Sequence, residues 1–115
     1  MSQELQTVCY RVQLKADSLD SVYEWSRELN GRQPEALQTL EEEGIFLESV
    51  FLERTDTGNY LIYYMKMRDP KKAAEIFAAS KHPIDEYHRN FQRATWEKGE
   101  RLELLLDLDR MKLNL

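Results

Sequence analysis

The chain has 115 residues, the length of one domain, with 42% hydrophobic residues, 32% charged residues and a formal net charge of −5. This acidic balance argues against nucleic acid or an anionic membrane as the main partner, because both need a basic protein face. No apolar run approaches the roughly 18 residues of a membrane span, and the acidic start is not a secretory signal. Cys9 is the only cysteine, so no internal disulfide is possible. We therefore expect one cytoplasmic domain over residues 1–115, without nucleic-acid or membrane partners.

The chain opens with a strand pattern followed by a helix signal. Residues 7–15 (TVCYRVQLK) alternate between apolar and polar side chains, which is the period of a half-buried strand. Asp17 or Ser18 can then cap a helix that runs to about Asn30, with an apolar stripe along one side. These residues predict a strand followed by a helix.

A second helical stretch and a hairpin come next. Pro34 suits the first turn of a helix and Gly44 its end, so we expect one bent helical region or two helices nearly end to end. The run Glu41–Glu43 within it is interpreted as a solvated helix end. Residues 45–53 and 60–67 are rich in β-forming side chains, and polar turn residues link them. This pattern predicts an antiparallel hairpin.

The second half of the chain predicts further helices and a last strand. Asp69 and His82 each precede a proline, which is typical of a capping residue before the first helical position. The later of these two helices is expected to end at Gly99. Residues 101–109 (RLELLLDLD) then place leucines on one side and mostly acidic side chains on the other, which predicts a final strand.

The order of these elements predicts an α+β, ferredoxin-like β-α-β-β-α-β domain with an extra helix before the last strand. Its helices cover one face of a four-stranded antiparallel sheet, and the other face has no cover from this chain. The middle strands are nevertheless apolar on both sides, with Phe46, Val50 and Leu52 on one side and Leu47 and Phe51 on the other. An apolar surface with a charged rim is typical of a subunit interface. We therefore expect a homodimer through the open sheet face, a dimeric α/β barrel.

Three stretches support this fold by resemblance. EGIFLESVFLE, NYLIYYMKM and HPIDEYHRNF, in this order and spacing, resemble a family of small bacterial proteins of unknown function. That family is assigned to the ferredoxin-like, dimeric α/β barrel superfamily, and the resemblance covers about Val8 to Asp109. The wider superfamily includes cofactor-independent monooxygenases, haem-degrading enzymes, sugar mutarotases and stress-response proteins. Fold alone does not choose among these activities.

The densest group of chemically active side chains lies in residues 82–88 (HPIDEYH). Asp85 and His88 are three residues apart on a predicted helix, so the carboxylate can orient the imidazole and raise its basicity. A histidine oriented in this way within an apolar cleft is a general acid–base pattern. The alternative is a core histidine that is merely paired with Asp85. The two histidines match no metal-binding spacing, so neither a metal nor another cofactor is predicted.

Two further charged groups are candidates for the site. Glu48 is surrounded by apolar residues of its strand, where a carboxylate needs a partner or a raised pKa, and Arg32 is its predicted partner. Arg11 lies on the polar side of the first strand. It either holds an anionic substrate or pairs with Glu103 and Asp107 of the last strand.

Aromatic side chains complete the predicted site. Trp25, Tyr63 and Tyr64 can line a pocket for a flat ligand, although such residues more often belong to the core. Neighbouring tyrosines on a strand point to opposite faces, so at most one of Tyr63 and Tyr64 shares a cavity with His88. Two functions stay open: a small-molecule-binding or cofactor-independent enzyme with a pocket between helices and sheet, or a non-enzymatic dimeric module whose polar cluster is structural. An enclosed cavity of roughly 300 Å³ or more beside His88 favours the first, and a filled core there does not.

Overall fold

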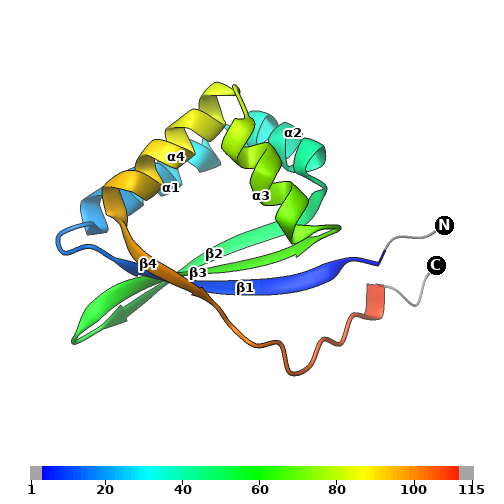
Figure 1. Cartoon of the computed structure of the whole chain (residues 1–115). Coiled ribbons are helices and arrows are strands. Elements are labelled where there is room, and N and C mark those ends of the chain that lie inside the picture. The colour runs from blue at the N-terminus through cyan, green and yellow to red at the C-terminus, as the bar shows by residue number, and fades with distance from the viewer. Residues whose placement is uncertain (1–3, 112–115) are drawn as a thin grey trace.

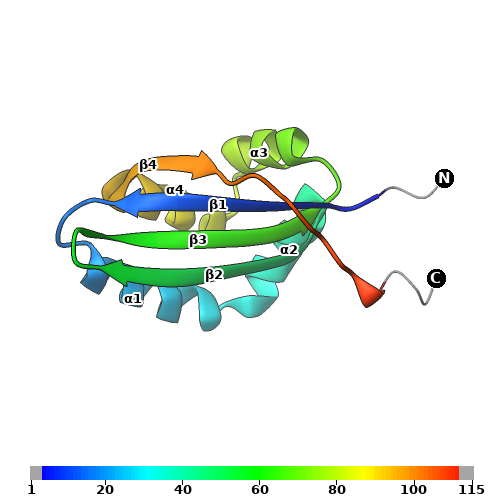
Figure 2. The same cartoon turned by 90° about the horizontal axis from the view of Figure 1, so that it is seen from below.

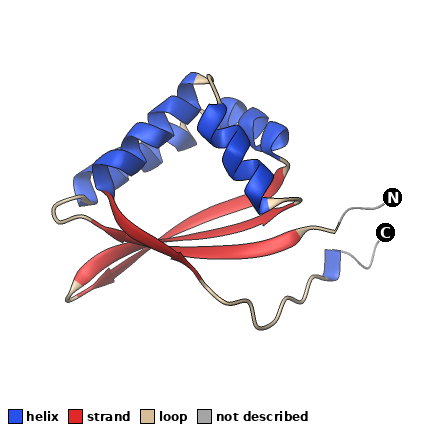
Figure 3. Ribbon diagram, viewed as in Figure 1, coloured by secondary structure: helices blue, strands red, loops and turns tan. Residues whose placement is uncertain are grey.

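The chain folds into two layers, a sheet and a helical cover. In the computed structural model, which describes residues 4–111, the helices all lie on one face of a four-stranded sheet (Figures 1 and 3). The elements follow in the order β1 (Gln6–Leu14), α1 (Leu19–Asn30), α2 (Gln33–Glu43), β2 (Ile45–Thr55), β3 (Gly58–Met67), α3 (Pro70–Ala79), α4 (Pro83–Thr95) and β4 (Trp96–Arg101). The predicted ferredoxin-like α+β fold is confirmed, with two helices in each of its helical positions.

The strands lie in the order β2-β3-β1-β4, and each neighbouring pair is antiparallel. The predicted hairpin of β2 and β3 is confirmed, and its strands are longer than expected, so that Asp56 and Thr57 alone separate them. Figure 2 shows the sheet from the side without helices, which we call the open face. The opposite, helix-covered face holds the core.

The helices form an arch over the sheet, with α1 beside α4 on one slope and α2 beside α3 on the other (Figure 1). Gly44 ends α2 in the left-handed conformation, with a φ of 74°, where glycine is favoured. The side chain of Asp69 caps α3 by accepting a hydrogen bond of 3.1 Å from the Lys72 N–H. No helix within residues 4–111 is long and apolar enough to cross a membrane.

Two apolar clusters hold the helices on the sheet. The larger involves α1 and α4, and the smaller involves α3. Their buried members are Val12, Leu14, Val22, Trp25, Leu61, Tyr63 and Phe91 in the larger cluster, and Val8, Ile45, Met67 and Ala73 in the smaller. Full burial of one large apolar side chain contributes about 1.5–3 kcal/mol. The two clusters therefore supply much of the stability of the fold.

The end of α4 differs from the prediction. The helix stops at Thr95, and Trp96–Arg101 pair with β1 as the edge strand β4. Gly99 lies within this strand opposite Val12, and it is not a helix terminus. The predicted last strand over residues 101–109 is wrong, because β4 already occupies the edge of β1.

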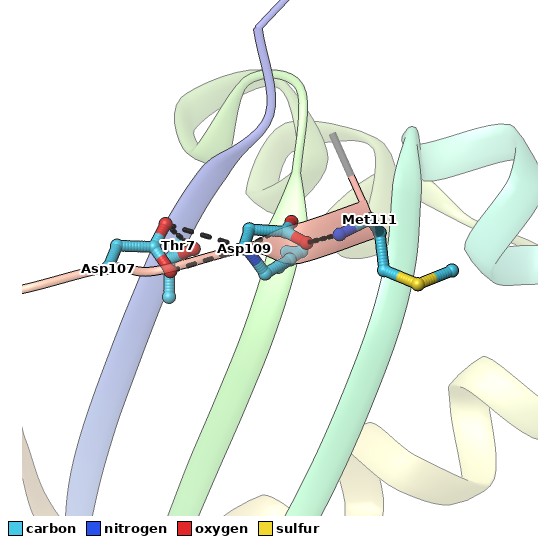
Figure 4. Close-up of polar contacts among 5 residues, drawn as sticks. Thr7, Asp107, Asp109 and Met111 are labelled. Carbon is cyan, nitrogen blue, oxygen red and sulfur yellow. Dashed lines mark hydrogen bonds and ion pairs between the residues drawn. The ribbon is translucent and has the colours of Figure 1, made fainter. Parts of the chain in front are cut away.

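Residues 102–111 instead cross the open face near the start of β1 (Figure 2). Asp107 accepts a hydrogen bond of 2.7 Å from the hydroxyl of Thr7 (Figure 4). Lys66 forms ion pairs with Asp107 at 3.4 Å and with Asp109 at 3.0 Å. The segment is therefore attached by its acidic side chains, while its apolar side chains are exposed. These are Leu102, Leu104, Leu105, Leu106 and Leu108.

Candidate functional site

A cavity of about 960 Å³ lies between the helical layer and the sheet. Every helix and every strand contributes to its lining, and apolar side chains of both core clusters form much of its wall. Four acidic or histidine side chains line it: Glu43 of α2, Glu48 of β2, and Asp85 and His88 of α4. The volume of the cavity lies within the range of roughly 300–1,000 Å³ that is typical of small-molecule sites.

His88 is held in the cavity wall by a residue of another helix. The indole Nε1 of Trp25, on α1, donates a hydrogen bond of 2.8 Å to Nδ1 of His88. Because an indole N–H can only donate, Nδ1 is the acceptor, and a neutral His88 carries its proton on Nε2. Rings surround the imidazole with centroid distances of 5.5 Å for Trp25 and Phe77 and 6.2 Å for Tyr63 and Phe91.

Burial determines the charge of His88. The residue is 8% exposed, and this burial lowers the pKa of its imidazole to about 4. It is therefore neutral at physiological pH, and within residues 4–111 its Nε2–H has no hydrogen-bond partner. The predicted orientation of His88 by Asp85 is wrong, because Trp25 makes the hydrogen bond that holds the ring.

Asp85 lies in the first turn of α4, where the helix dipole favours a carboxylate. It is 6% exposed and lines the cavity. Among the described residues, no side chain forms a hydrogen bond or ion pair with its carboxylate. Its negative charge acts on the two glutamates of the cavity and raises the pKa of both.

Glu48 extends from β2 to the helix side of the sheet together with Val50 and Leu52, as predicted. A β-bulge at the start of β2 shifts the register there, so Phe46 does not share this side and is exposed. Burial above all, and then the charge of Asp85, raises the pKa of Glu48 to about 7. A carboxyl group with this pKa populates both protonation states near neutral pH.

Glu43 is a cavity residue that no sequence pattern assigned to the site. The interpretation of Glu41–Glu43 as a solvated helix end is wrong for Glu43, which is 7% exposed and lines the cavity. Burial above all, reinforced by the charges of Asp85 and Glu48, raises its pKa to about 8. The signal for its position is its spacing of three residues from Leu40, which lines the same cavity.

Tyr63 and Trp96 add two buried donor groups to the wall. Tyr63 is 4% exposed and shares the cavity with His88. Its hydroxyl and the indole N–H of Trp96 are buried, and neither has a hydrogen-bond partner in the described part of the chain. Burial, and then the charge of Glu48, raises the pKa of Tyr63 well above its usual value. The Trp96 indole N–H opposes this rise from nearby, although the two groups do not reach hydrogen-bond geometry. The phenol therefore stays protonated and able to donate.

Tyr64 and Arg32, which were predicted to bind a ligand, lie outside the cavity. Tyr64 lies on the open face, because its neighbour Tyr63 points toward the helices. Arg32 forms ion pairs with Glu28 at 3.2 Å and with Glu35 at 2.8 Å on the helical surface. The predicted pairing of Arg32 with Glu48 is therefore wrong.

Arg11 also lies outside the cavity, on the open face. Its guanidinium forms an ion pair of 2.9 Å with Glu53 across the sheet. The predicted pairing with Glu103 and Asp107 is wrong, because β4 ends before Glu103 and because Asp107 pairs with Lys66. Arg11 therefore pairs with Glu53 of another strand on the open face.

Contacts at both ends of the α3–α4 connection hold α4 over the cavity. Arg89 of α4 donates hydrogen bonds of 2.6 and 2.8 Å to the backbone carbonyls of Phe77 and Ser80. His82, at the start of α4, pairs with Glu42 near the end of α2 at 2.9 Å. These contacts fix the helix that supplies Asp85 and His88 to the cavity.

Comparison with known proteins gives a family and a fold. A family of unknown function, DUF6176, matches residues 5–113. No curated protein matches the chain.

Solved structures match nearly the whole chain at low identity. An L-rhamnose mutarotase from Formosa agariphila is 16% identical with a TM-score of 0.63, over 90% of this chain and 99% of its own. A candidate antibiotic biosynthesis monooxygenase from Nitrosomonas europaea is 14% identical with a TM-score of 0.57, over 89% of each chain. A protein of unknown function from Bacteroides thetaiotaomicron is 17% identical with a TM-score of 0.54, over 90% of this chain and 100% of its own. These similarities show that the chain shares its overall fold with these proteins, and they show the fold alone.

Proposed function

The chain belongs to the family of unknown function DUF6176, and we propose that it is a cofactor-independent enzyme that transfers a proton within a small molecule bound between its helices and sheet. One observation carries the proposal: a neutral imidazole shares a cavity with carboxyl groups whose pKa values lie near neutrality. Such carboxyl groups can both accept and return a proton at physiological pH, which is the condition for general acid–base catalysis.

His88 and Glu48 have complementary roles in this reaction. The Nε2–H of His88 donates a hydrogen bond to a carbonyl oxygen of the substrate, because Trp25 already occupies Nδ1. The carboxylate of Glu48 removes a proton from the carbon beside that carbonyl and returns it to another atom of the same molecule. The substrate is isomerised without any net oxidation or reduction, so the reaction needs no cofactor.

The rest of the cavity supports a small organic substrate. Its volume of about 960 Å³ is in the range of small-molecule sites. The activities for which these structural neighbours are named, rhamnose mutarotation and antibiotic biosynthesis, both concern small molecules. This agreement supports a small-molecule ligand, and it does not favour either of those reactions, because identities of 14–16% show a shared fold only.

We propose a second copy of the chain as the partner of the open face. Leu47 and Phe51 are exposed there, half-buried Tyr64 lies beside them, and the exposed leucines of residues 102–108 add an apolar segment next to this face. A symmetric dimer covers such a surface with the same surface of its partner. We place the dimer in the reducing cytoplasm, which suits the unpaired Cys9.

Hydrogen–deuterium exchange at carbon tests the reaction before the substrate is known. The protein is incubated in heavy water with a mixture of small carbonyl compounds and sugars, and mass spectrometry records which of them gain deuterium. The wild type is expected to label at least one compound. Glu48→Gln and His88→Gln are expected to slow that labelling by about 10²–10⁴-fold. Glu41→Gln, at an exposed position of the same glutamate-rich region, is the control that keeps the wild-type rate.

Melting temperatures of the same variants separate catalysis from folding. Loss of labelling in a variant that melts like the wild type supports the proposed roles. The proposal fails if no compound is labelled, no compound changes the melting temperature, and His88→Gln costs several kcal/mol of stability. The histidine cluster then serves only the fold of a non-enzymatic module.

A further inference from the structure

The cavity carries an unbalanced negative charge. Glu43, Glu48 and Asp85 enter it from α2, β2 and α4, and the charge of Asp85 acts on both glutamates. Within residues 4–111, no lysine or arginine lines the cavity, and these carboxyl groups have no hydrogen-bond or ion-pair partner. Glu43 and Asp85 are buried and Glu48 is half-buried, and a carboxylate that loses hydration without gaining a partner is costly. A cationic ligand removes this cost.

Polar atoms outside the carboxyl cluster point to a ligand independently. The hydroxyl of Tyr63 is buried in the same wall and has no hydrogen-bond partner among the described residues. The only hydrogen bond of His88 in the described residues is the one at Nδ1, so its Nε2–H is also left to bind a ligand. Both side chains are more than nine-tenths buried. Native proteins satisfy nearly all such donors. A ligand that brings an oxygen acceptor into the cavity satisfies them here.

A metal ion does not fit this arrangement. No group of three or more His, Cys, Asp or Glu side chains within the described residues is placed to hold a metal ion. The carboxyl groups are instead spread around a cavity of about 960 Å³, which leaves room for a larger cation. The rings of Trp25, Tyr63, Phe77 and Trp96 lie in the same lining. Aromatic faces attract ammonium groups and cover an apolar body at the same time.

We propose that the ligand of this cavity is an organic amine. Its ammonium group binds Glu43 and Asp85, its apolar or aromatic body lies among the rings, and an oxygen of the same molecule accepts a hydrogen bond from His88. This inference rests on the proposed function and adds the charge class of the substrate to it. Glu48 stays available to move a proton. Anionic molecules are excluded by the same carboxyl groups, because like charges repel strongly in a low-dielectric site.

The charge of the cavity, and with it the affinity for an amine, depends on pH. The titratable side chains in its lining are Tyr10, Glu43, Glu48, Tyr63, Asp85 and His88. Because the pKa values of Glu43 and Glu48 are raised to about 8 and about 7, the negative charge increases as the pH rises through neutrality. An alkylammonium ion keeps its charge over this range, so its binding tightens with rising pH and releases protons.

A matched set of ligands tests the charge class. Phenethylamine, phenethyl alcohol and phenylacetate share one aromatic body and carry a positive, a neutral and a negative end. Titration calorimetry with the whole protein measures the Kd of each at about pH 8, and that of the amine also at about pH 6. The amine is expected to bind at least about tenfold more tightly than the alcohol, and phenylacetate more weakly than both. The amine is also expected to bind more tightly at the higher pH.

A pair of variants assigns this preference to the cavity. Glu43→Gln removes one carboxyl group from the proposed ammonium site, so the preference for the amine over the alcohol should fall by about tenfold. Glu41→Gln removes the same charge from an exposed position two residues earlier and should preserve the preference. A melting temperature of Glu43→Gln at or above that of the wild type shows that its fold is intact.

The binding results test the amine ligand separately from the proposed proton-transfer function. Equal affinity for the amine and the alcohol, or tighter binding of phenylacetate, overturns the amine inference but leaves the proposed function standing, because the cavity still binds a small molecule. Absence of binding by all three at millimolar concentration also overturns the amine inference. The exchange experiment in heavy water then decides the proposed function separately.

Discussion

The indole nitrogen of Trp25 on α1 donates a hydrogen bond of 2.8 Å to Nδ1 of His88 on α4. This bond joins α1 to α4, which lie side by side above the sheet and both line the cavity (Figure 1). It fixes the orientation of the imidazole and places its proton on Nε2. One contact therefore contributes both to packing and to the chemistry of the cavity.

Trp25→Phe removes the donor and keeps an aromatic ring in place. We expect the free energy of unfolding to fall by about 1–3 kcal/mol, because Nδ1 of His88 stays buried without a donor. Nitrogen NMR of the imidazole should change from a single Nε2-protonated form to a mixture of tautomers. Trp96→Phe is the matched control, because the Trp96 indole N–H is buried but lacks a partner among the described residues. Equal losses in both variants would show that Trp25 contributes by packing alone.

The two histidines of the chain should titrate in different pH ranges. Burial lowers the pKa of His88 from 6.5 to about 4, whereas the hydrogen bond to Glu42 raises the pKa of His82 above 6.5. The contribution of His88 to stability is therefore complete above pH 6.5 and is lost as the pH falls through about 4. NMR titration of the imidazole C–H signals measures both pKa values, and His82→Gln assigns them. Titration of His88 near 6.5 would contradict the neutral state that the proposed chemistry requires.

Local signals were sufficient to predict most elements of the fold. Asp69 before a proline starts α3, and Gly44 ends α2, because capping depends on a few adjacent residues. The same local rule is wrong at Gly99, which lies opposite Val12 in a strand pair that sequence alone does not specify. The leucine alternation of residues 102–108 predicts a strand equally well, but β4 already occupies the only free edge of β1 in the described sheet.

The sequence singled out His88, Asp85 and Glu48, which line the cavity, but it missed Glu43 and the contact that holds His88. His88 and Glu48 interrupt apolar faces, and such interruptions are visible in the sequence. The hydrogen-bond partner of His88 is not visible in the sequence. Trp25 lies 63 residues away, whereas Asp85, three residues away on the same helix, is the local partner that the spacing suggests. Arg32 shows the reverse case. Its helix neighbours Glu28 and Glu35 are closer along the chain than Glu48, and these local ion pairs form.

Glu43→Gln should stabilise the protein, and the gain should grow with pH. The folded-state pKa of Glu43 is raised from 4.5 to about 8, so the folded form binds a proton that the unfolded form has lost. The contribution of Glu43 to the stability of the folded protein is therefore most favourable below pH 4.5. It becomes destabilising as the pH rises through about 8. At pH values above about 8, we expect the free energy of unfolding of Glu43→Gln to exceed that of the wild type by about 2–4 kcal/mol.

Denaturant unfolding at several pH values measures this difference. Glu41→Gln changes the same charge at an exposed position and should follow the wild type at each pH. A Glu43→Gln variant that is less stable than the wild type at alkaline pH would mean that the carboxylate has a partner in solution, and that the cavity does not carry an unpaired charge.

Phe51→Glu should convert the proposed dimer into a monomer. Phe51 is 60% exposed on the open face, and a charge there would have to be buried without a partner in a face-to-face dimer. Light scattering after size-exclusion chromatography measures the mass of the 13.7 kDa chain and its assemblies. Leu37→Glu is the matched control, because Leu37 is also 60% exposed but lies on α2 in the helical layer. The wild type and Leu37→Glu should have twice the mass of Phe51→Glu. A monomeric wild type would contradict the proposed dimer. A dimer that survives Phe51→Glu and dissociates in Leu37→Glu would assign the interface to a surface other than the open face.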